Sequence, residues 1–505
     1  MLSTLIIIPL VGAVVIGLSS KNFRSQAIVN SLIAFGFTIW LAAQFDPQVA
    51  GMQFTENLPW IEWLGLNYHL GMDGLSLSLI LLNALLSIIA IAITAEDINR
   101  PKLYYSMILL LNAGVVGAFL AQDLIVFFLF YELEIIPLYF LIAIWGGEKR
   151  GYAATKFLLY TAFSGILVLA SFLGLVWLTG ANSFDFESLR HHTLPLTQEI
   201  ILLGTLLVGL FIKIPIFPFH TWLPDAHVQA STPISVMLAG ILLKLGTYGL
   251  IRFAIGLYLP AWTVIAPWLA TLAAISALYG ASCAIAQTDM KKVVAFSSIA
   301  HMAYVLLATA AGTRLSIIAA IIQMIAHGLI SALLFVLVGK VYNRTGTRDV
   351  NLLRGLLNPE RGLPITGSLM ILGVMASAGI PGMVGFVSEF VVFRSAFPIF
   401  PVQTILCLVG TGLTAVYFLL MINKVFFGRL SQQFATMRAV TLKEHIPAFI
   451  LTILILLLGI KPNFMTYFSE PQAGELLGVV NGAQIVANNS GMDTPINPIN
   501  EFKLQ

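Results

Sequence analysis

The chain has 505 residues, of which 58% are apolar and 10% are charged, and its formal net charge is +3. Soluble domains carry about 25% charged residues, so this composition excludes an ordinary soluble domain and indicates a polytopic membrane protein. The small net charge argues against nucleic-acid binding. The two cysteines, Cys283 and Cys407, lie far apart in apolar runs, without the spacing of an iron–sulfur or zinc site.

Apolar runs of about 20 residues predict membrane-spanning helices. The sequence contains such runs at residues 2–20, 27–45, 73–95, 104–122, 124–146, 153–179, 198–222, 232–258, 263–287, 291–311, 314–342, 364–398, 402–428 and 443–461. Prolines break the seventh run at Pro215 and Pro218 and the twelfth at Pro381, because proline cannot donate to the helical ladder. The first run lacks a basic n-region and a cleavage site, so we expect a retained span. The prediction is an all-α membrane protein of about 14 transmembrane helices.

The distribution of basic residues predicts the orientation of these spans. If the N-terminus faces away from the cytoplasm, the loops after odd-numbered spans carry 18 of the 26 Lys and Arg residues, and the opposite loops carry six, Arg252 among them. The remaining two, Lys213 and Lys244, lie inside spans. We therefore expect both termini on the non-cytoplasmic side.

The spans group into four regions. The N-terminal region, 1–103, includes segment 46–72, which has no Lys or Arg and predicts a hairpin at the outer face. Spans four to eight (104–258) and nine to thirteen (263–428) predict two five-helix repeats, because the fourth member of each is broken by Ile-Pro. Since five is odd, the repeats are inverted relative to each other, as in many transporters. Region 429–505 holds the last span and an Asn-, Gly- and Pro-rich tail, which we expect to be loosely structured or laid against a partner.

Two glutamates and a lysine lie inside spans, where a charge costs roughly 2.5–3.5 kcal/mol. Glu132 predicts a functional carboxylate, the alternative being a carboxylate satisfied by a neighbour or by water in a crevice. On a regular helix Glu134 points about 200° away from Glu132, so the two cannot share a face, and its role stays open. Lys213 is the natural ion-pair partner of Glu132, because their separation would control whether the lysine keeps its proton. The alternative for Lys213 is snorkelling to a surface.

Four further ionisable residues lie deep in later spans. Lys244 is too deep to snorkel fully, and its alternative is a static ion pair. His301 and His327 lie in successive spans, between a buried lysine and a buried glutamate in chain order. This position is equally compatible with a proton relay and with two hydrogen-bonded core residues. Glu389 follows the second break and predicts a functional carboxylate.

The polar turn after the first break and one later loop stay ambiguous or structural. His220, Asp225 and His227 are candidates for a proton entrance or for ordinary turn chemistry. Asp289 and the lysines of 291–292 predict a charged cytoplasmic loop. The sequence shows no Ser/His/Asp arrangement, phosphate loop or haem-ligand pair.

Several long motifs carry a family resemblance. They read FIKIPIFPFHTWLPDAH, TPISVMLAGILLKLGTYGLIR, AQTDMKKVVAFSSIAHM, IQMIAHGLISALLFVLVGKVY and GIPGMVGFVSEF, in that order. This series resembles the proton-translocating antiporter-like subunits of respiratory complex I, which are related to multisubunit cation/proton antiporters. The likeness covers about residues 100–430.

Within that group the chain is most similar to the M-type members (subunit 4), since Glu389 stands where the L- and N-types usually have a lysine. The motif wording resembles the cyanobacterial and chloroplast form of the complex, which implies a thylakoid membrane with both termini lumenal. The resemblance implies no cofactor in this chain, with plastoquinone, iron–sulfur clusters and the electron donor held by partner subunits. Implied partners are other membrane subunits, including antiporter-like ones, and lipids, but no nucleic acid. The short N-terminus favours the CO2-uptake variant, whose partners would include CO2-hydration subunits, and the respiratory and cyclic variant stays open as the alternative.

The resemblance also assigns roles to six residues. It implies a modulating pair, a central proton carrier, two bridging histidines and an exit carboxylate, which here are Glu132 with Lys213, Lys244, His301 with His327, and Glu389. The expected function is proton translocation coupled to quinone reduction elsewhere in an NAD(P)H/ferredoxin–plastoquinone oxidoreductase. The main alternative is a subunit of a Na⁺/H⁺ antiporter, and the others are a structural membrane subunit and a haem- or quinone-holding redox subunit.

Overall fold

The structure is a computed structural model that describes residues 1–49, 51–434, 436–437, 440–470 and 474. The N-terminal region consists of α1 (Leu2–Leu18), α2 (Phe23–Gln44), strands β1 (Gln53–Ile61) and β2 (Leu66–Met72) with a 3₁₀ turn between them, and α3 (Gly74–Ala92). Most of the predicted tail lies outside the described residues; its beginning forms the short helix α20 (Asn463–Thr466).

The first predicted repeat contains helices of very different length. They are α4 (Pro101–Leu120), α5 (Leu124–Leu133), α6 (Ile135–Trp145), α7 (Arg150–Thr179), α8 (Phe186–Arg190), α9 (Leu196–Lys213), α10 (Trp222–Gln229), α11 (Thr232–Met237), the π-helical η2 (Leu238–Leu242), α12 (Leu243–Gly249) and the π-helical η3 (Leu250–Ile255). The second region contains α13 (Leu259–Ile285), α14 (Met290–Ala311), α15 (Arg314–Thr345), α16 (Pro364–Ser377), α17 (Val384–Ala396) and α18 (Pro401–Phe426), and α19 (Leu442–Ile460) follows it.

The helical membrane fold predicted from the apolar runs is confirmed. Within the described ranges, 12 helices are long and apolar enough to cross a membrane. The predicted spans 2–20 and 364–398 fall on shorter helices: α1 has 17 residues, and α16 and α17 have 14 and 13 on either side of a break. The number of 14 spans, the four regions and the inverted relation of the two repeats stay predictions.

Local signals explain where several helices begin and end. The carboxylates of Asp73, Asp123 and Asp289 each accept hydrogen bonds from backbone N–H groups in the first turn of α3, α5 and α14. These groups have no partner within a helix, so an N-cap carboxylate stabilises the start. Helix α7 ends at Gly180, whose φ of 66° lies in the left-handed region that glycine adopts at little cost.

Both predicted helix breaks are present, and a third occurs that the sequence reading missed. Helix α9 ends at Lys213, and a turn of residues 214–221 separates it from α10. Residues 378–383 likewise separate α16 from α17. The additional break lies between α5 and α6, at Glu134. Pro137, three residues later, has no N–H to give to the carbonyl of Leu133, which weakens the ladder at this point.

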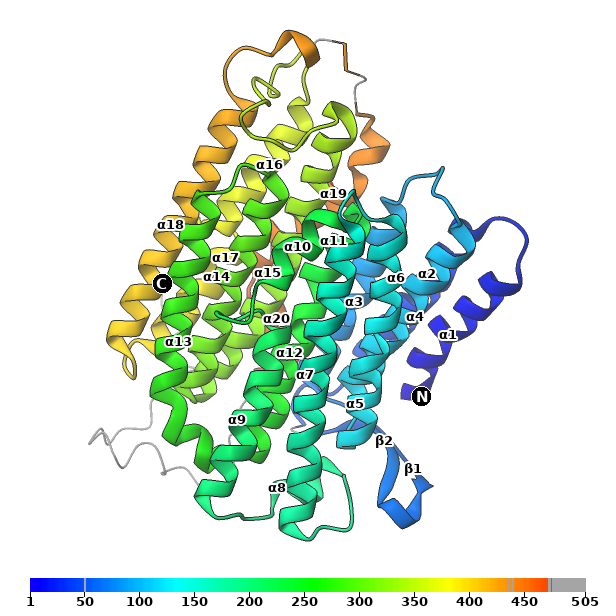
Figure 1. Ribbon diagram of the computed structural model, residues 1–505, viewed down its shortest axis with the longest axis vertical. Coiled ribbons are helices and arrows are strands. Elements are labelled where there is room, and N and C mark those ends of the chain that lie inside the picture. Colours follow the sequence, from blue (N-terminus) through cyan, green and yellow to red (C-terminus); the bar gives the residue numbers. More distant parts are fainter. Residues whose placement is uncertain (50, 435, 438–439, 471–473, 475–505) are drawn as a thin grey trace.

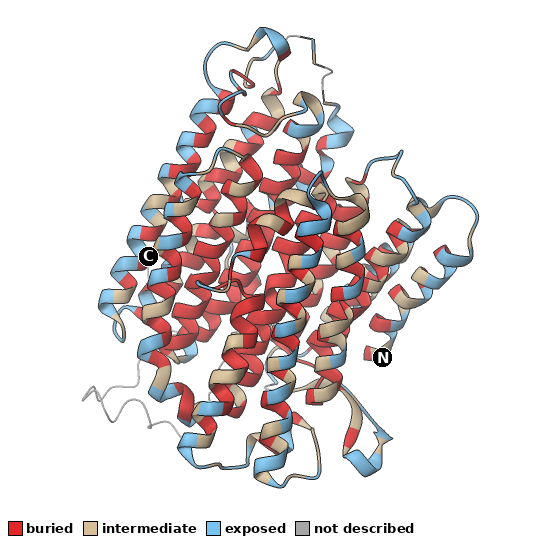
Figure 2. Cartoon of the chain, in the orientation of Figure 1, coloured by how far each residue is buried: buried red, intermediate tan, exposed pale blue. Residues whose placement is uncertain are grey.

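The most enclosed helices lie in the middle of the bundle. In Figure 1 the long helices run side by side, with the β1–β2 hairpin and α8 at one end and the α18–α19 connection at the other. Figure 2 shows the buried residues concentrated between the outer helices. In the most apolar 18-residue stretch of each span, all residues are buried in 232–255 and in α15, and 94% are buried in α14, whereas only 28% are buried in α2. A charged side chain on one of the central helices is therefore shielded from lipid and from bulk water.

One basic residue assigned to an outer loop lies inside the protein instead. Arg252 is in η3, within the eighth span, and forms an ion pair with Asp73 at the start of α3. Both side chains are buried, and Arg252 also donates from Nε to the hydroxyl of Tyr248 at 3.3 Å. The expectation that Arg252 belongs to a non-cytoplasmic loop is therefore wrong, because an internal carboxylate compensates its charge.

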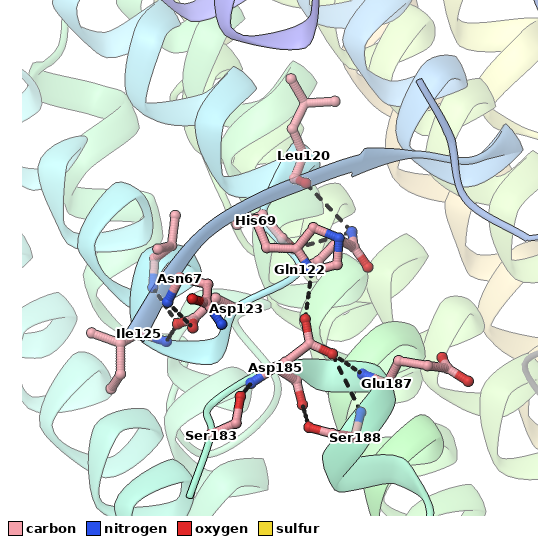
Figure 3. Close-up of polar contacts among 12 residues, drawn as sticks. Asn67, His69, Leu120, Gln122, Asp123, Ile125, Ser183, Asp185, Glu187 and Ser188 are labelled. Carbon is pink, nitrogen blue, oxygen red and sulfur yellow. Dashed lines mark hydrogen bonds and ion pairs between the residues drawn. The ribbon is translucent and has the colours of Figure 1, made fainter. Parts of the chain in front are cut away.

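The hairpin predicted within 46–72 is present, and a polar cluster attaches it to the bundle; its location on the outer face stays a prediction. Strands β1 and β2 pair antiparallel. Figure 3 shows the attachment: His69 forms an ion pair with Asp185, and the backbone N–H of Asn67 donates to Asp123 at 3.2 Å. The N–H of Gln122 donates to the carbonyl of His69 at 2.9 Å. These contacts hold the hairpin against the starts of α5 and α8.

We expect His69→Ala to loosen this hairpin. A hydrogen bond to a charged group contributes about 1.5–3 kcal/mol, so the free energy of local opening should fall by that order. Burial alone would raise the pKa of Asp185, but the hydrogen bond and charge of His69 and two backbone N–H groups outweigh burial and hold this pKa below its usual value. A carboxylate with a depressed pKa stabilises the folded state above its ordinary pKa, and this contribution disappears as the pH falls through the depressed value.

Hydrogen–deuterium exchange of residues 53–72 measures this opening. His69→Ala should speed exchange at neutral pH, and the difference between variant and wild type should begin to shrink at the ordinary carboxylate value of about 4 and disappear as the pH falls through the lower pKa of Asp185. Glu187→Gln, at the exposed neighbour of Asp185, is the control. Equal exchange in His69→Ala and wild type at neutral pH would contradict the attachment.

Candidate functional site

Lys244 lies at the centre of the buried ionisable residues. It is on α12, between the π-helical segments η2 and η3, and it is fully buried. Its Nζ donates to the carbonyl of Ala239 at 2.7 Å and lies 2.8 Å from Nδ1 of His327. π-Helical turns occur frequently at functional sites, because they release backbone carbonyls from the regular ladder. The Lys244–His327 contact is short enough for direct proton transfer.

Two histidines and a glutamate continue this contact along neighbouring helices. The rings of His327 on α15 and His301 on α14 have centroids 5.9 Å apart. Nε2 of His301 lies 3.3 Å from Oε1 of Glu389 on α17 and 3.1 Å from the carbonyl of Ser377, and its Nδ1 lies 2.7 Å from the carbonyl of Ser297. Since both ring nitrogens of His301 face oxygen acceptors, the site accommodates the doubly protonated ring.

A small cavity accompanies this part of the line. Its volume is about 10 Å³, and its polar lining comes from Ser297, His301, Gln323, His327, Ser331, Ser377, Ser388 and Glu389. A volume of about 10–15 Å³ is the minimum for one water molecule. Nε2 of His327 is buried without a hydrogen-bond partner, so the cavity can supply one. A water there would connect the two rings and the carboxylate.

The structure pairs Lys213 with a different glutamate from the one expected. Lys213 forms its ion pair with Glu134, and both side chains are buried. Nζ of Lys213 also lies 4.2 Å from the centroid of the Tyr131 ring, within the range of a cation–π contact. Glu134 keeps helical backbone angles, with φ of −70° and ψ of −21°, and it is the glutamate that faces Lys213, whereas the Glu132 carboxylate lies against Gly165 of α7. The predicted direct pair of Glu132 with Lys213 is therefore replaced by the pair of Glu134 with Lys213.

Glu132 remains close to this pair. Its Oε1 is buried without a hydrogen-bond partner, and its carboxylate lies against Gly165 of α7, where an added Cβ would overlap it. The charges of Lys213 and Glu134 both act on Glu132. Glu132 is thus a second carboxylate near one lysine, rather than the direct partner of that lysine.

Lys213 and Lys244 lie on adjoining elements, α9 and α12. An ideal Cβ at Gly246 of α12 would lie 3.2 Å from the Cβ of Lys213, so the backbones of α9 and α12 approach closely there. In the low-dielectric interior that holds both lysines, a charge acts over a longer range than in water. The six predicted residues therefore lie in two adjacent groups. The first holds Lys213 with its partner Glu134, and Glu132 lies beside it. The second is the line formed by Lys244, His327, His301 and Glu389.

The polar segment that follows α9, which contains Asp225 and His227, borders a large cavity through Asp225. The cavity has a volume of about 990 Å³, and its lining includes Asp225, Gln229, Asp289, Lys291 and Arg348. Asp225 pairs with Lys156 at 2.8 Å. His227 is buried against Phe335, with ring centroids 4.6 Å apart, and neither of its ring nitrogens has a hydrogen-bond partner.

Lys291 departs from the prediction of a charged loop. Asp289 caps α14 near the cavity, but the side chain of Lys291 is buried and donates to the carbonyl of Ala230 at 2.7 Å. It also donates to the carbonyl of His227 at 3.2 Å and to Oγ of Ser235 at 3.1 Å. A lysine at the first turn of an apolar helix gives no sequence signal that separates a loop charge from one that binds freed carbonyls.

Among the described residues, no group of three or more His, Cys, Asp and Glu side chains could hold a metal ion. The ionisable residues instead form contacts of the kind that pass protons, with nitrogen and oxygen atoms facing each other at 2.8–3.3 Å. Glu134, Tyr131 and Lys291 are site residues that sequence reasoning did not select. For Glu134 the signal was present as Pro137, which predicts a local irregularity in the helix.

Comparison with known proteins gives consistent matches. Residues 121–414 match the family described as NADH:quinone oxidoreductase/Mrp antiporter, transmembrane. The NAD(P)H-quinone oxidoreductase chain 4 1 of Nostoc sp. is 38% identical over 507 residues, which covers 96% of this chain and 93% of the relative. One chain of respiratory complex I from Thermus thermophilus with bound NADH has a TM-score of 0.87 and 27% identity, over 95% of this chain and 100% of that one. The Mrp complex from Dietzia sp. has a TM-score of 0.81 and 25% identity, over 94% of this chain and 52% of that one.

These matches cover the helices that carry the buried ionisable residues, from Glu132 on α5 to Glu389 on α17. They confirm the resemblance to antiporter-like membrane subunits that the sequence motifs indicated. The chain belongs to the NADH:quinone oxidoreductase/Mrp antiporter transmembrane family.

Proposed function

We propose that this chain moves protons across a membrane as one subunit of a NAD(P)H–quinone oxidoreductase. Quinone reduction and its redox centres belong to partner subunits, as the names of the relatives suggest. The observation that carries the proposal is the buried line from Lys244 through His327 and His301 to Glu389, whose contacts lie on the most enclosed helices.

The residues of this line divide the work. A proton reaches the Lys213–Lys244 half from the end of the bundle that holds the large cavity, which we assign to the cytoplasmic side. When the Lys213–Glu134 pair opens, the freed charge of Lys213 repels the proton on Lys244. That proton passes to Nδ1 of His327, then through the cavity water to His301, and leaves by Glu389.

The surroundings that we propose follow from the relatives. The partners are further membrane subunits of a complex I-like assembly, and its plastoquinone, iron–sulfur clusters and electron donor lie outside this chain. Location in a thylakoid membrane with lumenal termini fits the cyanobacterial relatives and the basic loops. The CO2-uptake variant, with CO2-hydration subunits as partners, stays a prediction.

The test of this function is Glu389→Gln in the assembled complex. Glutamine fills the same space but cannot release a proton, so we expect donor-driven proton uptake by vesicles to fall by roughly 100-fold through this chain. Electron transfer should fall with it if the two are tightly coupled. Glu360→Gln, at an exposed loop carboxylate, is the matched control. Full proton uptake in Glu389→Gln at equal assembly would remove the proposed exit.

The likeness to an Mrp complex supports a second candidate, a subunit of a Na⁺/H⁺ antiporter. Sodium prefers oxygen ligands, whereas the buried line here presents one lysine and two histidines for each carboxylate. Proton uptake that depends on a sodium gradient in vesicles holding the complex would favour the antiporter. Uptake that follows electron transfer without sodium favours the oxidoreductase.

A further inference from the structure

The ammonium group of Lys213 interacts with two carboxylates, those of Glu134 and Glu132. Glu134 holds the ion pair, and the charges of Lys213 and Glu134 both act on Glu132. Glu132 lies in the last turn of α5, and Glu134 lies at the junction between α5 and α6. The Glu132 carboxylate lies against Gly165 of α7, whereas Glu134 contacts Lys213 of α9, so one lysine has an acidic group on either side of its neighbouring span.

Both carboxylates have unused hydrogen-bonding capacity. Oε1 of Glu132 and Oε2 of Glu134 are buried without partners. An unpaired buried carboxylate oxygen is costly, so each atom favours the approach of a donor. Gly165 leaves the space that the Glu132 carboxylate occupies, since any larger residue there would overlap it.

The aromatic ring beneath the lysine offers a path between the two partners. Nζ of Lys213 stands 4.2 Å from the centroid of Tyr131, the residue next to Glu132. The Tyr131 hydroxyl lies within hydrogen-bond distance of Oγ of Ser164, at 3.2 Å. The Ser164 hydroxyl in turn donates to the carbonyl of Gly209 at 2.7 Å, which holds it in place. A fixed aromatic face stabilises a cation without forming an ion pair, and the flexible lysine stem allows the ammonium to move across it.

We propose that Lys213 exchanges between Glu134 and Glu132, and that Glu134 is the positioning residue that holds it in the resting arrangement. This inference rests on the proposed proton-transfer function. Two carboxylates and one ammonium would leave a net buried negative charge, which is strongly unfavourable. One proton therefore completes the group, and it resides on the carboxylate that Lys213 does not contact.

The exchange balances without any outside reactant. In the resting arrangement Lys213 is paired with ionised Glu134 and Glu132 carries the proton; in the other, Lys213 is paired with ionised Glu132 and Glu134 carries it. The O–H bond breaks on one carboxyl and forms on the other, and no charge enters or leaves the group. Movement of the ammonium toward α7 thus changes its separation from Lys244 at no cost in buried charge.

The experiment follows the carboxyl groups by infrared difference spectroscopy of the whole complex on quinone reduction. The wild type should show a carboxylic C=O band that disappears and a second that appears, because the proton changes carboxyl. Glu132→Gln and Glu134→Gln should each abolish the pair of bands and lower coupled turnover about tenfold, in line with the loss of one positioned proton group. Glu199→Gln, at a buried carboxylate of α9 outside this group, should keep both bands.

Two other results of the Glu134→Gln experiment are possible. If this variant keeps the wild-type bands and turnover, the exchange is refuted. If it prevents assembly of the complex, the variant Glu134→Asp is tested in its place. The shorter aspartate should restore assembly and shift the frequency of the C=O band that comes from the carboxyl at position 134. A band at the wild-type frequency would refute the exchange. Glu389→Gln separates the two proposals. Loss of proton uptake in that variant with intact exchange bands supports both the proton line and the exchange. If Glu389→Gln loses proton uptake and Glu134→Gln also keeps its bands, the proton line is supported and the role of Glu134 is refuted.

Discussion

Lys244→Ala is expected to stop proton transfer through this chain while leaving the complex assembled. The ammonium group of Lys244 contacts His327, and alanine cannot give a proton to Nδ1 across this distance of 2.8 Å. Loss of a positioned acid or base lowers proton transfer by roughly 100-fold or more. Donor- or light-driven proton uptake by vesicles holding the whole complex measures it, compared with wild type at equal assembly.

Two companion variants separate charge from proton release. Lys424→Ala removes an exposed lysine at the end of α18 and should leave uptake unchanged. Lys244→Arg keeps the positive charge, but arginine does not release its proton in proteins, so this variant should assemble and remain inactive. Normal uptake in Lys244→Ala would reduce the buried charges to structural pairs and leave only the fold and family established.

The sequence predicted the membrane fold well because its signals are local. Apolar runs report burial in lipid directly, and Pro215 and Pro381 favour the breaks found beside them, since proline lacks an N–H. Pro267 and Pro447, by contrast, lie inside unbroken helices. The ionisable residues on regular helices, such as His301 and His327, were also placed correctly deep in their spans. A charge in an apolar run is expensive wherever its helix packs, so its presence alone points to the interior.

The missed contacts depend on geometry that no local pattern specifies. The sequence does not specify which of Glu132 and Glu134 faces Lys213, because that depends on how their span packs against α9. Arg252 was counted as a loop residue because its span was expected to end near it, and its buried partner Asp73 is 179 positions away in sequence. Long-range pairing of this kind is decided by packing.

The Asp73–Arg252 pair carries the largest expected effect on assembly. Both side chains are buried, and Asp73 also caps α3 through the N–H of Ser76 at 2.8 Å. Arg252→Met leaves the Asp73 carboxylate without its charge partner in the interior. Breaking a buried pair in this way costs about 3–5 kcal/mol, so we expect little assembled complex in membranes carrying this variant. The amount of assembled complex after mild solubilisation measures the effect.

A second substitution distinguishes an uncompensated charge from a loss of packing. Asp73→Asn added to Arg252→Met removes the buried negative charge and keeps an acceptor for the cap of α3, so assembly should recover to a large extent. Equal failure of the single and double variants would mean that Arg252 acts through its packing against Tyr248 and Phe186, whose rings lie 5.4 and 5.9 Å from its guanidinium carbon. Because this pair lies outside the line from Lys244 to Glu389, its double variant should pump protons once assembled. The same interior thus contains buried charges of two kinds: those that must stay paired for the protein to fold, and those that must change partner for it to work.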